Sequence, residues 1–191
     1  MTVDEILGVI DKDAAFYEET GGVTISGGEP FLQKATLELL KACKKRGYST
    51  AVETSGYADT ELLISAVPFV DLFLWDIKDT DEERHIRYTG VSNELILKNL
   101  SAANGLSAKI RLRCILVNGV NTNETHYKKV VDVAKTINGF DGVELIPYHA
   151  YGGSKSVFIG GEDNGKPEWI PKKEQLACAK AFFESFDVKI R

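Results

Sequence analysis

The stretch Ser26-Gly27-Gly28-Glu29-Pro30 combines residue types that suit the binding of an amino group. Glu29, held next to Pro30, is a fixed acceptor for an ammonium or amine, and the two glycines let that amine reach the backbone. A Gly-Gly pair alone is equally compatible with a simple turn. The full five-residue string is much rarer, so it predicts a binding site.

Other polar residues of interest follow apolar segments further along the chain: Glu53, Thr54, Asp76, Lys78, Arg113 and His149. Two neighbouring acids suit a cation or ribose hydroxyls, and a lysine at the end of a strand suits a Schiff-base nucleophile. Plainer interpretations stay open, namely ordinary loop acids, a solvated lysine and a packing histidine. Periodicity does not decide whether Arg113 faces the interior or the rim.

The elements that must position these residues alternate between strand and helix patterns. Strands are expected at 23–26, 48–53, 70–76, 109–117 and 143–146, and helices at 4–18, 33–46, 59–66, 93–103, 123–135 and 172–185, with a last extended segment at 188–190. This alternation predicts a parallel α/β sheet, open or curled into a barrel. The continuous apolar run 70–76 is typical of a strand covered on both faces. Because parallel sheets bind ligands outside the carboxyl ends of their strands, the polar residues predict one rim.

Composition narrows the function classes. The 191 residues predict a single domain, 1–191, at the usual size of about 150 residues per domain. The net charge is −5 and no basic run occurs, which argues against nucleic acid, and no apolar run nears the roughly 20 residues of a membrane span. Cys43, Cys114 and Cys178 are widely spaced, which favours a reducing cytoplasm and core positions. His85 and His126 lie in polar, helix-like surroundings and are expected at the surface.

Successive blocks of the sequence resemble one known family. The blocks are "GGVTISGGEPFLQ", "VETSGY", "LFLWDIKDTDEERH", "YTGVSNELILKNL" and "ELIPYHAYGGSK". In this order they are similar to the glycyl-radical-enzyme activating proteins of the radical S-adenosylmethionine enzymes, whose type is the pyruvate formate-lyase activating enzyme. The resemblance covers nearly the whole chain. It implies a partial (β/α) barrel of parallel strands that lacks the first strand.

The resemblance also implies roles for the rim residues. Gly27, Gly28 and Glu29 match the strand end that binds the amino group of S-adenosylmethionine. Glu53 and Thr54 match a pair near the methionine carboxylate and a monovalent-cation site, to which Asp76 also corresponds. Lys78, Arg113 and His149 match residues near the cofactor. The type enzyme has Asp-Thr-Asn-Gly where this chain has Glu-Thr-Ser-Gly, a difference that bears on the target enzyme and the cation site.

One family feature is missing from this sequence. The family holds a 4Fe-4S cluster with a Cys-x3-Cys-x2-Cys loop, which is expected before Met1, and the three cysteines present are not expected to replace it. For the complete protein the resemblance implies reduction by flavodoxin or ferredoxin, reductive cleavage of S-adenosylmethionine, and hydrogen abstraction from a backbone glycine of a glycyl radical enzyme in anaerobic metabolism. The chain alone is not expected to do this chemistry.

Two alternatives stay open at this point. The chain could be a non-catalytic remnant that binds S-adenosylmethionine or a partner protein. It could instead be a lyase that uses Lys78 as a Schiff base.

Overall fold

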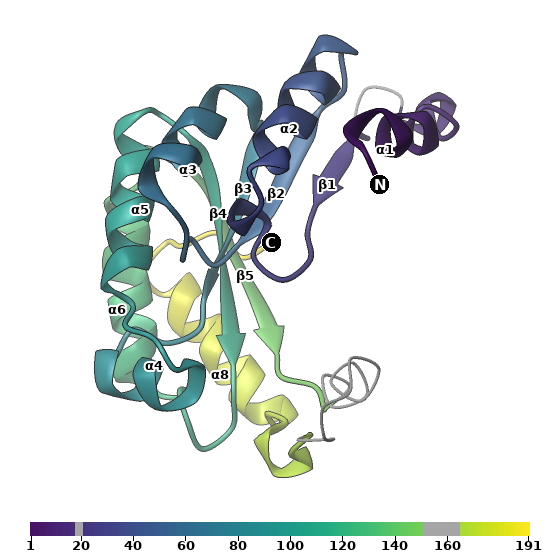
Figure 1. Ribbon diagram of the computed structural model, residues 1–191. Helices are drawn as coiled ribbons and strands as arrows, with labels where there is room; N and C mark the ends of the chain where they lie inside the picture. Colours follow the sequence, from purple (N-terminus) through teal and green to yellow (C-terminus); the bar gives the residue numbers. More distant parts are fainter. Residues whose placement is uncertain (18–20, 151–164) are drawn as a thin grey trace.

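The structure, a computed structural model, describes residues 1–17, 21–150 and 165–191. Five parallel strands form one sheet in the order β1-β2-β3-β4-β5, which is also their order along the chain (Figure 1). The strands are β1 (Val23–Ile25), β2 (Thr50–Thr54), β3 (Leu72–Ile77), β4 (Lys109–Leu116) and β5 (Gly139–Pro147). The α/β class and all five expected strands are therefore confirmed.

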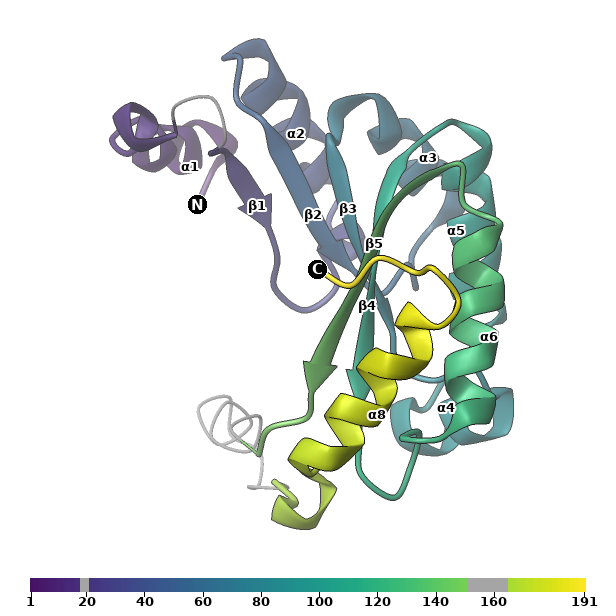
Figure 2. The same ribbon diagram turned by 180° about the vertical axis from the view of Figure 1, so that it is seen from behind.

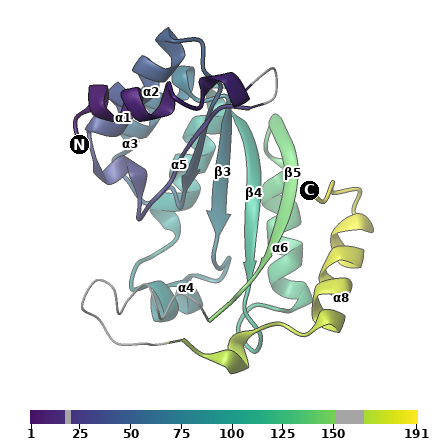
Figure 3. The same ribbon diagram turned by 90° about the vertical axis from the view of Figure 1, so that its right-hand side faces the viewer.

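The helices lie mainly on one side of this sheet. They are α1 (Val3–Ile10), α2 (Ala35–Lys45), α3 (Thr60–Ala66), α4 (Glu82–Thr89), α5 (Glu94–Gly105), α6 (Glu124–Lys135) and α8 (Lys173–Glu184). Figures 1 and 2 show α2, α3, α5 and α6 along one face, with α1 beyond β1 and α8 beside β5. Figure 3 shows the other face, where β3, β4 and β5 are seen with α5 and α6 behind them. We call this uncovered side the inner face.

The strands alternate between the two sides, as the two-residue period of extended chain requires. In β3, Phe73, Trp75 and Ile77 are buried against the helices, whereas Leu72, Leu74 and Asp76 are half-buried on the inner face. The expectation that both faces of segment 70–76 are covered was therefore wrong for the described residues. Leucines on the inner face make the run look continuous in sequence.

The core fills the layer between sheet and helices. Its fully buried members include Leu40, Val52, Leu63, Phe73, Trp75, Ile110, Leu112, Val130 and Phe183. Each such side chain contributes about 1.5–3 kcal/mol by leaving water. This one-sided core holds the strands in register and leaves the polar side chains at the strand ends accessible from the inner face.

Local signals set the helix ends. Thr2 and Glu5 form a capping box at the start of α1, and α1 ends at Ile10, not at residue 18, because Asp11 and Asp13 follow and aspartate favours turns. Residue 18 itself lies outside the described residues. Helix α4, which was not expected, begins after the Asp81 cap and ends at Gly90 in the left-handed conformation.

The end of the chain returns to the sheet. The Val143 N–H donates to the Lys189 carbonyl at 2.8 Å, and the Arg191 N–H donates to the Val143 carbonyl at 2.9 Å. Ile190 thereby pairs in parallel with Val143, as the expected extended segment 188–190 requires. Among the described helices, none combines the length and apolar character needed to cross a bilayer.

Candidate functional site

Four side chains from four consecutive strands meet at the carboxyl edge of the inner face. The Ser26 hydroxyl, just after β1, donates to Glu53 Oε2 on β2 at 2.8 Å. Arg113 on β4 places Nη1 3.0 Å from the same oxygen and Nε 3.6 Å from Asp76 Oδ1 on β3. Register pairs Asp76 directly with Arg113. The structure therefore places Arg113 at the rim, the point that periodicity left open.

The two acids of this group differ electrostatically. Burial raises the pKa of Asp76, and the positive charge of Arg113 offsets only part of that rise. Burial also opposes ionisation of Glu53, but the Ser26 hydroxyl and the Arg113 guanidinium outweigh it and hold the pKa of Glu53 below its ordinary value. The ionised carboxylate of Glu53 is therefore well stabilised by Arg113, whereas the charge of Arg113 offsets only part of the cost of burying an ionised Asp76.

Asp76 carries the clearest sign of a missing partner. Its Oδ1 is buried and accepts no hydrogen bond from the residues that the structure describes, because the 3.6 Å to Arg113 Nε is too long for one. An unsatisfied buried acceptor costs about 1–3 kcal/mol. A ligand that brings an ammonium or hydroxyl donor to this oxygen would remove that cost.

Glu29 ties the turn after β1 to the end of β2. Its Oε1 accepts from the Thr54 hydroxyl at 2.7 Å and from the Phe31 N–H at 3.3 Å. Its Oε2 accepts from the N–H and hydroxyl of Ser55, at 2.9 and 2.7 Å. The carboxylate is thus fixed in place by two strand ends. Because two of its four donors are rotatable hydroxyls, it can still exchange them for a ligand amine.

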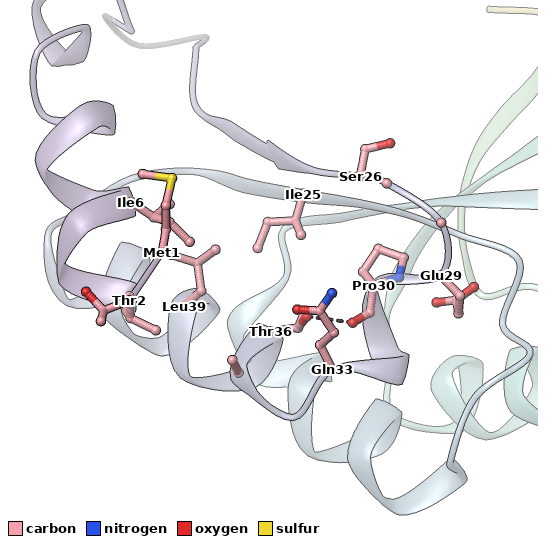
Figure 4. A pocket seen from close by; sticks show the side chains of 14 residues that line it. Met1, Thr2, Ile6, Ile25, Ser26, Glu29, Pro30, Gln33, Thr36 and Leu39 are labelled. Carbon is pink, nitrogen blue, oxygen red and sulfur yellow. Dashed lines mark hydrogen bonds between the residues drawn. The ribbon is translucent and has the colours of Figure 1, made fainter. Parts of the chain in front are cut away.

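The glycines next to Glu29 leave space open. Gly27 has a φ of +145°, and a Cβ built on Gly27 or Gly28 would meet no atom of the described residues within 4 Å. Close approach to the backbone is therefore possible here, as the sequence predicted. A hollow of about 280 Å³ also borders this turn, between α1 and α2. Gly27, Gly28 and Glu29 line this hollow together with Met1 and Ile6, and Figure 4 shows Glu29 beyond Pro30 as seen from Met1, so the hollow reaches the candidate site at that end.

Lys78 and His149 lie further along the same edge. Lys78 follows β3, and His149 follows β5; both side chains are exposed. Lys78 lines a second hollow of about 270 Å³, whose other walls include Ile115, Tyr148 and Trp169. The block "ELIPYHAYGGSK" continues to residue 155, and residues 151–155 of it lie outside the described residues.

The described residues do not fit a metal cluster. Cys43 and Cys114 are buried in α2 and β4, as expected, whereas Cys178 is exposed on α8, so the core position expected for it was wrong. Within 1–17, 21–150 and 165–191, no three His, Cys, Asp or Glu side chains are arranged to hold a metal ion. Arg113, a cation itself, lies between Glu53 and Asp76. The described residues therefore do not supply a set of ligands for a 4Fe-4S cluster. The monovalent-cation site stays a prediction.

Several residues of the site were missed in the sequence. Ser26 and Ser55 hold the two glutamates, and Glu144 on β5 lies beside Arg113 in register. His85 and His126 are buried, not on the surface as expected, with 2% and 0% of their areas exposed. The polar neighbours of both histidines on α4 and α6 gave no signal of this burial. His85 Nδ1 lies 2.8 Å from the Val91 carbonyl, beyond the end of α4, and 3.0 Å from the Thr89 hydroxyl, whereas His126 Nδ1 lies 2.9 Å from the Thr80 hydroxyl.

Comparison with known proteins agrees with this geometry. A profile of the Radical SAM superfamily matches residues 1–132. The choline trimethylamine-lyase activating enzyme of Oleidesulfovibrio alaskensis is 42% identical over 84% of this chain and 54% of its own length. The trans-4-hydroxy-L-proline dehydratase activating enzyme of Clostridioides difficile is 39% identical over 99% of this chain and 65% of its own.

A solved structure shows the same architecture. A domain of the pyruvate-formate lyase-activating enzyme from Bacteroides vulgatus is 27% identical, with a TM-score of 0.72 over 89% of this chain and 97% of that one. The chain spans between about half and two thirds of the length of the two curated relatives. The five-stranded parallel sheet is thus a radical SAM partial barrel. The chain belongs to the Radical SAM superfamily, and its relatives are activating enzymes of glycyl radical enzymes.

Proposed function

We propose that this chain is the S-adenosylmethionine-binding core of an enzyme that activates a glycyl radical enzyme. The observation that carries the proposal is the buried Oδ1 of Asp76 at the carboxyl edge, which faces Arg113 but accepts no hydrogen bond from the described residues. An amino acid carries an ammonium and a carboxylate on one carbon. A free acceptor beside a guanidinium offers a partner to each.

Different residues of the carboxyl edge would bind different parts of the ligand. Gly27 and Gly28 leave room for the amino acid part to approach the backbone, and Asp76 and Glu29 accept from its ammonium. Arg113 and Lys78 offer cations to its carboxylate, while His149 lies at the far end of the edge, on the nucleoside side. Once bound and reduced by one electron, S-adenosylmethionine would supply the radical that takes a hydrogen atom from a backbone glycine of the partner protein. The protein's own part is to hold the ligand and exclude water.

The partner and the electron donor belong to the proposal as well. The relatives are named for choline trimethylamine-lyase and trans-4-hydroxy-L-proline dehydratase, and the solved domain for pyruvate formate-lyase. We propose a glycyl radical enzyme as protein substrate, with pyruvate formate-lyase as one candidate. Flavodoxin or ferredoxin would deliver the electron in the cytoplasm.

The test uses the complete protein under anaerobic, reducing conditions with S-adenosylmethionine and each candidate partner. Electron paramagnetic resonance then detects the glycyl radical on the partner. We expect a radical with the unchanged protein and with Asp132→Asn, which alters an exposed acid whose ion pair among the described residues is with Lys128. Asp76→Asn should reduce its rate of formation at least tenfold. Absence of a radical with every partner, or an unchanged rate in Asp76→Asn, would contradict the proposal.

A further inference from the structure

Asn121 joins the ends of β3 and β4 with its whole amide group. The side chain is fully buried in the turn after β4. Its Nδ2 donates to the carbonyls of Lys78 and Ile115, both at 2.8 Å, and its Oδ1 accepts from the Val117 N–H at 2.7 Å. The ladder between the two strands ends at the Ile77–Cys114 pair. Asn121 therefore extends their connection to Lys78.

Two more buried side chains hold the next two residues. Asn93, which precedes α5, donates from Nδ2 to the Asp79 carbonyl at 3.3 Å. His126 on α6 accepts the Thr80 N–H at Nδ1, at 3.3 Å, and the Thr80 hydroxyl lies 2.9 Å from the same nitrogen. Because a backbone N–H can only donate, Nδ1 carries no proton, and the proton of the neutral ring lies on Nε2, which faces the Cys114 sulfur at 3.5 Å.

The Asp79 side chain completes this arrangement. Its two oxygens accept a bidentate pair of bonds from Arg84, at 2.7 and 2.8 Å, and Oδ1 also accepts from the Asp81 N–H at 2.8 Å. Three consecutive residues, 78–80, are therefore held by side chains from three separate elements. Such buried polar groups are stabilising only when every partner is present, so the path of this segment is strongly specified.

The segment 78–80 carries one charged group of interest for binding, the ammonium of Lys78. This side chain is exposed, and its charge lowers the pKa of Asp76, which burial raises. Within the described part of the chain, no carboxylate lies within ion-pair distance of Lys78. It lines the hollow that Ile115 and Trp169 also border. Because the four-carbon side chain of a lysine is flexible, the position of the Lys78 backbone determines which region its ammonium can reach.

We propose that Asn121, Asn93 and His126 form a positioning clamp that fixes the backbone of Lys78 and so presents its ammonium to the carboxylate of the ligand at the carboxyl edge. The carboxylate part of this statement rests on the proposed function. The clamp itself is a property of the ligand-free chain. The three side chains bond to the backbone of residues 78–80, so their effect on the ligand passes through Lys78.

The first test measures the clamp without ligand. Backbone ¹⁵N order parameters are compared in the unchanged chain, Asn121→Ala and Asn104→Ala. Asn104 is a matched control, because its amide also bridges two segments, at the Thr136 carbonyl and the Asn138 N–H, near the start of β5. We expect residues 78–80 to be near about 0.85 in the unchanged chain and Asn104→Ala, and to fall below about 0.6 in Asn121→Ala while 72–77 stay rigid.

Should Asn121→Ala fail to fold, Asn93→Ala removes a single bond and serves the same comparison. Rigid 78–80 in whichever of these variants folds would overturn the clamp. A loss of order throughout β3 would also overturn it, because Asn121 would then act on global stability alone.

The second test links the clamp to binding through a double-mutant cycle on the affinity for S-adenosylmethionine. Asn121→Ala and Lys78→Met should each weaken binding about tenfold, and the double variant should bind no more weakly than Lys78→Met. Multiplied losses in the double variant would show that Asn121 does not act through Lys78. If the unchanged chain does not bind at all, the proposed function fails, and the order parameters alone decide the clamp.

Discussion

Replacing Gly56 by alanine should disrupt the turn that holds Thr54 and Ser55 in place. Gly56 has a φ of +75°, which costs an L-residue about 1–2 kcal/mol. An added Cβ would also clash with Cζ2 of Trp75, which is fully buried and cannot move freely. Overpacking of this kind costs about 1–3 kcal/mol. Together these effects predict a loss of about 2–5 kcal/mol in the free energy of unfolding.

Gly90→Ala is the matched control for this prediction. Gly90 has a similar φ of +83°, but its Cβ would meet no atom within 4 Å in the part of the chain that the structure describes. It should therefore cost only the backbone strain, about 1–2 kcal/mol. Urea unfolding followed by circular dichroism gives both values, and the difference isolates the Trp75 contact. Equal losses in the two variants would refute the reasoning, because the clash would then be relieved without cost.

Three further predictions concern buried groups. Burial raises the pKa of the Cys114 thiol to about 12 and also raises the pKa of Cys43. A thiol reagent should therefore react only with the exposed Cys178 in the folded protein. Fast reaction of three thiols would be incompatible with the structure. Burial lowers the pKa of His126 to about 4. Because the unfolded histidine binds its proton near pH 6.5, the free energy of unfolding should fall by up to about 1.4 kcal/mol per pH unit as the pH drops from about 6.5 to about 4. His126→Gln should remove that slope, and an unchanged slope would assign it elsewhere. Burial opposes ionisation of Asp141, but nearby guanidinium groups outweigh it and lower the pKa of this carboxyl in the folded protein. The contribution of Asp141 to the free energy of unfolding is therefore complete above about pH 4, near the pKa of an unfolded aspartate. It is lost as the pH falls through the lower pKa of the folded state. Asp141→Asn should cost about 3 kcal/mol at pH 7 and flatten the acid limb below pH 4, whereas a loss under about 0.5 kcal/mol would argue against these ion pairs.

Much of the fold could be predicted from the sequence. Apolar segments of strand length, separated by helical patterns, are local signals, and each of the five strands was placed within a few residues except the start of β5. That start was missed because glycines in a sequence usually indicate a turn. In this strand Gly139 and Gly142 instead flank a register shift between β4 and β5. The extent of α1 was overestimated because the apolar Phe16 continues its pattern into a separate 3₁₀ turn.

The site was only partly predictable for a physical reason. The parallel sheet brings all strand ends to one edge, so Glu53, Asp76 and Arg113 could be grouped without coordinates. Which partner each one finds depends on tertiary contacts. His126 bonds to Thr80, 46 residues away, and neither residue carries a local sign of it. The surface position expected for His126 was wrong because the sequence shows a helix's polar neighbours but not what covers the helix.

The most direct test of the account is calorimetric titration of this chain, residues 1–191, with S-adenosylmethionine. The account predicts saturable binding at one site, weakened at least tenfold, or about 1.4 kcal/mol, in Asp76→Asn and unchanged in Asp132→Asn. Absence of binding by the chain, or equal affinity in the two variants, would contradict the claim that the carboxyl edge around Asp76 holds the amino acid part of the ligand.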